Sequence, residues 1–169
     1  SQPLAPEYRY CLMQLSPDGG DATEIREFDL VAKRFVKDGF NVPVAKSRVS
    51  WVDRDTLFIA TDFGPGSMTQ SGYARIAKRW RRGTPLSAAE TLYEAQPEDM
   101  AVFAYHDRTP GFERDFVGRS LDFYRRDYFL LAQDGRQKKI DIPADAELDT
   151  HREWLLIKPS SDWEVGGKR

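Results

Sequence analysis

Hydrophobic and polar residues alternate with a period of two through the middle of the chain. In the segment KSRVSWV, Val49 and Trp51 share one face while Lys46 and Arg48 share the other, which is the pattern of a half-buried strand. The segment TLFIATDF is almost continuously apolar, as expected for a strand covered on both faces. Polar and glycine-rich turns follow each segment. The pattern predicts four antiparallel strands, at residues 46–52, 56–63, 73–80 and 91–93.

Similar strand-and-turn units flank this central sheet. Turn signals such as SPDGG at residues 16–20 and Asp134-Gly135 recur roughly every ten residues, the spacing of an all-β repeat protein. Each unit has the layout of a four-stranded propeller blade. We therefore predict an all-β fold, a partial β-propeller of about three blades in which two complete antiparallel blades lie between two incomplete ones. The predicted limits are a partial blade at 8–37, blades at 46–95 and 99–142, and a partial blade at 146–158.

Finer expectations concern single segments. The first unit lacks its first strand, and residues 38–43 cross from it to the next unit. Gly118 lies where the alternation along the predicted strand 112–124 changes phase, which indicates a β-bulge. Residues 86–90 form one turn of helix at most.

An arc of about three blades cannot close into a ring, because closed propellers have about four blades or more. We therefore interpret the chain as part of a larger propeller. Such an arc leaves two sheet faces and the lining of the central channel in water. The chain alone is expected to self-associate in order to cover them.

Composition and charge fit a folded domain without a polyanionic partner. The 169 residues are 40% hydrophobic and 31% charged, within the range of soluble globular domains with a sizeable core. A net charge of −2 gives no overall field that attracts nucleic acid or an anionic membrane. The longest apolar runs, such as residues 100–105, are too short to cross a bilayer. The first residues lack the basic and apolar segments that would predict a secretory leader. We expect neither nucleic-acid nor membrane partners.

Metal and cofactor chemistry has little support in the residues. Cys11 is the only cysteine, which excludes an internal disulfide and any multi-cysteine metal site, and its apolar neighbours predict a buried thiol. His106 and His151 are too sparse for a histidine metal cluster. The bend Gly64-Pro65-Gly66 lacks the lysine and the following helix of a phosphate-binding loop. No metal and no cofactor are expected.

The sequence also gives little support for a catalytic site. A nucleophile elbow requires glycines two positions before and two positions after its serine. Ser67 and Ser71 do not meet this requirement. A triad of Ser67 with one of the two histidines remains possible by counting alone, but a loop between two strands is the favoured interpretation. We name no catalytic, cofactor-binding or metal-binding residue in this chain.

A basic cluster surrounds Trp80 and has two interpretations. Cations beside an aromatic ring can bind nucleic acid, whereas a strand that ends in an exposed turn would leave Trp80 in the core between blades. The net acidity favours the second. Arg75, Arg79 and Arg125-Arg126 are then expected to pair with carboxylates of neighbouring blades. The carboxylates Glu94, Glu98 and Asp99 lie in a polar connector without an apolar pocket that would raise a pKa.

Several segments resemble the propeller of bacterial prolyl oligopeptidase-like serine peptidases. The most specific are SWVDRDTLFIATDFGPGS and KRWRRGTPL, and FDLVAKRFV, TPGFERDFVGRSLDFY and HREWLLIKPSSDWEVGG add to them. The resemblance runs from about Tyr8 to Gly167. It implies a propeller joined to an α/β-hydrolase domain that carries a serine, aspartate and histidine triad, with the propeller gating access of short peptides that are cleaved after proline. None of the triad motifs occurs in this chain, so the resemblance implies a non-catalytic portion whose partners are the missing hydrolase domain and the remaining blades.

Two other functions stay open beside this one. The chain could come from a propeller that binds peptides or other proteins without peptidase activity, and within the family an oligopeptidase that selects basic residues is a further alternative. A Gly-x-Ser-x-Gly elbow after a strand, in sequence beyond Arg169, would favour the peptidase. The compartment is open between cytoplasm and periplasm, with the cytoplasm slightly favoured.

Overall fold

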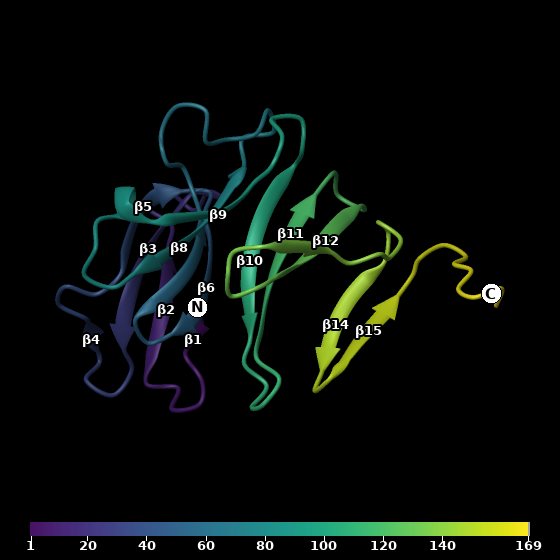
Figure 1. Cartoon of the computed structure of the whole chain (residues 1–169). Coiled ribbons are helices and arrows are strands. Elements are labelled where there is room, and N and C mark those ends of the chain that lie inside the picture. Colours follow the sequence, from purple (N-terminus) through teal and green to yellow (C-terminus); the bar gives the residue numbers. More distant parts are fainter. Residues whose placement is uncertain (169) are drawn as a thin grey trace.

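The computed structural model describes residues 1–168 and shows an all-β chain. Its strands form four antiparallel sheets, which follow one another in sequence order across the molecule (Figure 1). Each sheet is built from consecutive strands, and the described sheets do not close into a ring. The predicted all-β partial propeller is therefore confirmed. No helix in the described part of the chain is long and apolar enough to span a membrane.

We name the sheets I to IV in chain order. Sheet I consists of β1 (Gln2–Pro3), β2 (Tyr10–Leu15), β3 (Thr23–Asp29), β4 (Arg34–Phe35) and β5 (Asn41–Ala45). Sheet II consists of β6 (Arg48–Asp53), β7 (Thr56–Ala60), β8 (Ile76–Arg81) and β9 (Glu90–Glu94), with a 3-10 turn at Leu86–Ala88 before the last strand. Sheet III consists of β10 (Ala101–Asp107), β11 (Arg114–Ser120), β12 (Arg126–Leu131) and β13 (Gln137–Lys139). Sheet IV consists of β14 (Glu147–His151) and β15 (Trp154–Lys158).

Strand β7 explains why the sheets stack. All five of its residues are buried. Since successive side chains point to opposite faces of the sheet, both faces must be covered by neighbouring sheets. Leu57 and Ile59 join a core cluster shared with sheet I. Phe58 and Ala60 join a second cluster shared with sheet III. The expectation of a strand covered on both faces is thus confirmed.

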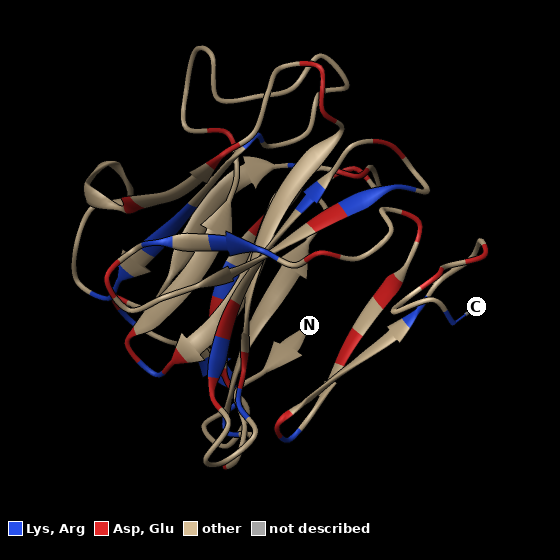
Figure 2. Cartoon of the chain, turned by 45° about the vertical axis from the view of Figure 1, so that its right-hand side comes forward, with Lys and Arg blue, Asp and Glu red and all other residues tan. Residues whose placement is uncertain are grey.

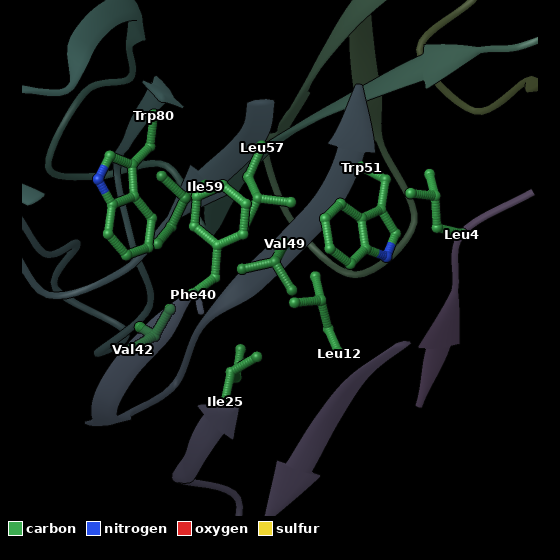
Figure 3. Close-up of a cluster of buried hydrophobic side chains, with 10 residues drawn as sticks. All are labelled: Leu4, Leu12, Ile25, Phe40, Val42, Val49, Trp51, Leu57, Ile59 and Trp80. Atoms are coloured by element: carbon green, nitrogen blue, oxygen red, sulfur yellow. The ribbon is translucent and has the colours of Figure 1, made fainter. Parts of the chain in front are cut away.

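The cluster between sheets I and II is centred on three aromatic rings (Figure 3). The ring of Phe40 lies 5.0 Å from that of Trp80 and 5.9 Å from that of Trp51, both edge-on. The indole N–H of Trp51 donates to the Gln2 carbonyl and that of Trp80 to the Thr84 carbonyl, so neither buried donor lacks an acceptor. Trp80 therefore belongs to the core between sheets, as the second interpretation of the basic cluster predicted.

Two expectations about sheet I were wrong. The sheet has a first strand, β1, which pairs with Cys11 and Leu12 of β2. Residues 38–43 do not simply cross to the next sheet, because β5 pairs with β3 beyond the point where the two-residue β4 ends. This pairing buries Phe40 and Val42, whose apolar side chains would be exposed in a free connection.

The expected bulge at Gly118 was also wrong. Pairing of β11 with both β10 and β12 is regular through this residue. A Cβ at Gly118 would lie 2.1 Å from Cζ of Phe103. The glycine is therefore needed for the close approach of an aromatic ring. The register shifts in sheet II lie instead between Trp51 and Asp53 and between Ala77 and Lys78.

Sheet IV is a hairpin at the end of the arc, set apart from the other sheets (Figure 1). Leu148, Leu155 and Ile157 occupy its half-buried side. The opposite side carries Trp154 and Leu156, which are 63% and 52% exposed. Strand β15 pairs only with β14 in the described part of the chain, so an apolar face and one strand edge are both left open.

Candidate functional site

A groove runs along the first strands of the sheets. Strands β1, β6 and β10 each open a sheet and, within residues 1–168, pair on one edge only, which is the innermost position in a propeller blade. Between them lies a cavity of about 650 Å³. Its walls are residues 46–50 around β6, residues 101–105 of β10, and side chains of sheet I and of the long β7–β8 loop, including Gln2, Gln14, Asp21 and Tyr73.

The groove combines aromatic rings with positive charge. The Lys46 ammonium lies 4.9 Å from the centre of the Tyr73 ring and 3.9 Å from the Asp21 carboxylate. The Arg48 guanidinium lies 5.7 Å from the centre of the Phe103 ring. These groups can hold an extended polar ligand, because cations and aromatic faces supply both charge and flat apolar surface.

Sheets I and II are joined by a buried ion-pair cluster beside the aromatic core. The Glu27 carboxylate on β3 is fully buried and contacts Nη1 of Arg54 at 2.5 Å and Nη1 of Arg82 at 2.9 Å. It also accepts the backbone N–H of Phe40 at 3.0 Å. Burial raises the pKa of Glu27, while the Phe40 N–H and the Arg54 guanidinium oppose that rise. The cluster joins the two sheets through opposite charges, and Arg82 also donates two hydrogen bonds to the Glu27 carboxylate, whereas Nη1 of Arg54 contacts it as an ion pair only.

Polar contacts also join sheets II and III. Arg79 of β8 contacts the Asp115 carboxylate of β11 at 3.5 Å, and the other Asp115 oxygen lies 2.7 Å from Nδ1 of His106. Arg108 donates to the Trp51 carbonyl, and the Gln137 amide donates to the Leu92 carbonyl. Both walls of the groove are therefore held to one another by contacts outside it.

Asp107 and Arg114 connect sheet III to the hairpin of sheet IV. Arg114 donates to the Asp107 carboxylate at 2.8 Å and also to the Arg152 carbonyl. Burial works to raise the pKa of Asp107, but hydrogen bonds from Thr109 and Arg114 and from the Thr150 hydroxyl outweigh it and lower the pKa to about 2. Asp107 is thus held as a carboxylate at neutral pH.

The residues weighed as catalytic candidates do not form a triad. The Ser67 hydroxyl binds within its own loop, to the Gly64 carbonyl at 2.6 Å, the Asp62 carboxylate at 3.2 Å and the Phe63 N–H. His106 contacts Asp115, and His151 is exposed at the tip of sheet IV. In residues 1–168 no group of three His, Cys, Asp or Glu side chains is placed to hold a metal ion. Cys11 is buried, as predicted, and burial raises the pKa of its thiol.

The basic cluster around Trp80 is largely neutralised by carboxylates. Arg82 pairs with Glu27 and Asp55, and Arg79 with Glu90 and Asp115. Lys78 lies 4.4 Å from the Phe63 ring centre. Positive and negative residues are interspersed along the strands and turns of the molecule (Figure 2).

The predicted inter-blade ion pairs are confirmed only in part. Arg79 reaches Asp115 in the next sheet, whereas Arg75 pairs with Glu94 of its own sheet and Arg125 with Asp122 of its own turn. Arg126 contacts no carboxylate within the described residues. Asp99, expected in an open connector, is buried and receives two hydrogen bonds from Arg119 at 2.8 and 2.9 Å.

Comparison with known proteins places this arrangement in a family. Residues 2–110 match the family profile described as the N-terminal β-propeller domain of prolyl oligopeptidase. An uncharacterized peptidase of Sinorhizobium fredii is 32% identical over 95% of this chain, and one of Rickettsia prowazekii is 29% identical over 90% of it. The chain covers 23% of each relative, so it spans about a quarter of their length.

Solved structures give the same result. A post-proline cleaving enzyme from Rickettsia typhi superposes with a TM-score of 0.84 at 27% identity, over 96% of this chain and 26% of that protein. A structure from a study of two prolyl endopeptidases gives a TM-score of 0.72 at 12% identity, over 89% of this chain and 23% of that one. Oligopeptidase B from Leishmania major gives 0.62 at 15% identity, over 92% and 22%. The last two show the shared fold alone.

Proposed function

Because this chain belongs to the family of prolyl oligopeptidase N-terminal β-propeller domains, we propose that it is the non-catalytic propeller portion of a serine peptidase. The longer protein would hydrolyse short peptides after proline, with a hydrolase domain supplying the catalytic groups. The likeness to a post-proline cleaving enzyme supports this substrate class. We further propose blades with the limits 46–95, 99–142 and 146–158; the first blade takes in β1 and β5 and so extends beyond the predicted 8–37 on both sides.

The observation that carries the proposal is the groove along the first strands. It lies where a propeller has its central channel, and its floor and walls are held by ion pairs and hydrogen bonds between sheets. A passage of this kind admits an extended peptide. A folded substrate domain would first have to unfold, at a cost of about 5–15 kcal/mol. The propeller would thus select substrates by size.

Size selection can be tested in the longer protein with an unstructured peptide series. Peptides of rising length that share one proline site would be compared with a stably folded protein that carries the same site in a surface loop. We expect cleavage of the short peptides and no cleavage of the folded protein. Equal rates for peptide and folded substrate would contradict gating by the propeller.

A peptide-binding propeller without peptidase activity is the second candidate. The groove favours this candidate because its cations and aromatic rings can bind a peptide but cannot break a peptide bond. Peptide binding by the longer protein, without hydrolysis and without labelling by a serine-directed inhibitor, would support this function over the first.

We also propose that the isolated chain self-associates. Sheet IV exposes Trp154 and Leu156 on one face, and the outer edge of β15 beside it has no pairing strand in the part of the chain that the structure describes. In the longer protein the remaining strands and blades would cover this surface. Exposed apolar surface next to a free strand edge favours pairing with another chain.

A further inference from the structure

Two arginines approach one aromatic ring at the groove. The Phe103 ring centre is 5.7 Å from the guanidinium carbon of Arg48, on sheet II, and 5.0 Å from that of Arg126, on sheet III. The ring is seated over Gly118, where any Cβ would clash with it. The Phe103 ring is therefore held in position by its packing on Gly118. Strands β6 and β12, which are distant in sequence, each place an arginine beside it.

These two arginines differ from most others in the chain. Most half-buried arginines elsewhere meet carboxylates within 4 Å, as Arg82 meets Glu27 and Arg119 meets Asp99. In residues 1–168, Arg48 and Arg126 form no such ion pair. Arg126 instead donates to two neutral oxygens, Ser120 Oγ at 3.2 Å and Tyr128 Oη at 3.4 Å.

Uncompensated guanidinium groups attract an anion from outside the protein. A carboxylate suits them, because the planar fork of arginine binds both of its oxygens. Arg48 and Phe103 also line the 650 Å³ groove together with Lys46 and Tyr73, which gives room for the rest of a peptide. The acidic net charge of the chain disfavours a polyanion such as nucleic acid.

We propose that Arg48, which lines the groove, and Arg126, which approaches the same Phe103 ring, form a carboxylate-binding site for short peptides. This inference deepens the proposed function, because it names the peptide group that the propeller would hold. The carboxylate could be the C-terminus of the peptide or an Asp or Glu side chain. Binding to the site requires no bond-breaking step.

The test is a binding titration of the 169-residue chain followed by heteronuclear NMR. Three probes are compared: acetyl-Ala-Pro-Ala with a free carboxylate, its C-terminal amide, and the amide of acetyl-Ala-Pro-Glu. The first is expected to shift the Phe103 resonances, and the plain amide is not. Binding of the glutamyl amide would assign the site to side-chain carboxylates as well as C-termini, and its failure to bind would restrict the site to C-termini. Equal binding of the plain amide would overturn the proposal.

Variants locate the site. Arg48→Gln and Arg126→Gln are each expected to weaken binding of the free acid by about tenfold, the loss of one charge-assisted hydrogen-bonded contact. Arg136→Gln is the matched control, because Arg136 is 84% exposed and, among the described residues, its side chain pairs only with Asp134 of its own turn. This variant should bind as the unaltered chain does. Arg48 is exposed, so its variant remains folded even where Arg126→Gln fails to fold. Unchanged affinity of Arg48→Gln would overturn the proposal.

Two more measurements distinguish a peptide carboxylate site from a general anion site and from the peptidase itself. Inorganic phosphate at the same concentration should compete weakly; tighter binding of phosphate than of the free acid would contradict a peptide site. Peptidase activity of the longer protein is measured separately. Carboxylate binding without hydrolysis would refute the proposed peptidase and leave the site standing, whereas hydrolysis without carboxylate dependence would refute the site alone.

Discussion

Among polar substitutions, those in the buried cluster around Glu27 should lower the free energy of unfolding the most. Replacing Glu27 with Ala removes the carboxylate that Arg54, Arg82 and the Phe40 N–H share. The two guanidinium groups are only 34% and 22% exposed, so water cannot fully replace their partner. Loss of one partner from a buried ion pair costs about 3–5 kcal/mol. For a domain of this size that corresponds to a fall in Tm of roughly 10 °C.

The assay is urea unfolding followed by tryptophan fluorescence, because Trp51 and Trp80 report on the core beside this cluster. Glu27→Gln should lose less stability than Glu27→Ala, since the amide oxygen still accepts hydrogen bonds and burial already disfavours the charge. Glu98→Ala is the control: Glu98 is exposed, and such changes alter stability by about 0.5 kcal/mol or less. If Glu27→Ala lost no more than Glu98→Ala, the cluster would not hold sheets I and II together.

Three other predictions follow from single contacts. Gly118→Ala should cost about 1–3 kcal/mol of unfolding free energy, because its Cβ would meet the Phe103 ring; unchanged urea unfolding would contradict that approach. The pKa of Asp107, about 2 in the folded chain, lies below its ordinary value, so its contribution to stability is present above pH 4 or so and is lost as the pH falls towards 2; Asp107→Asn should flatten this acid limb in pH-dependent unfolding, and an unchanged limb would refute the assignment. Trp154→Glu should reduce self-association of the isolated chain in sedimentation equilibrium, and a variant that associates as strongly as the unaltered chain would exclude sheet IV as the contact surface.

The sequence was sufficient where side-chain alternation is long and regular. Val49 and Trp51 on one side of β6, and the apolar run of β7, predicted a central sheet covered on both faces. Burial of Trp80 followed from the same pattern, because a strand ending in a turn keeps its inward side chain in the core. The physics involved is local, since a period of two is set by the backbone of one strand.

The features that were predicted wrongly depend on partners that are distant in sequence. Strand β5 was not predicted because its place is set by β3 and by burial of Phe40 and Val42. Gly118 looked like a bulge because its role is fixed by the Phe103 ring on the neighbouring strand. The proposed carboxylate site at Arg48 was missed for the same reason. The sequence shows that a strand carries an arginine, but it does not show whether a carboxylate from a distant strand pairs with it. The first-strand position of Arg48 was the one signal that pointed towards the channel.

Hydrolysis of a chromogenic proline peptide tests the central claim most directly. Acetyl-Ala-Pro-p-nitroanilide would be incubated in parallel with the 169-residue chain and with the longer protein that contains it. The chain is expected to release no p-nitroaniline, and the longer protein to release it in a reaction abolished by a serine-directed inhibitor. Inhibitor-sensitive release by the chain alone, or none by the longer protein, would contradict a non-catalytic propeller portion of a peptidase.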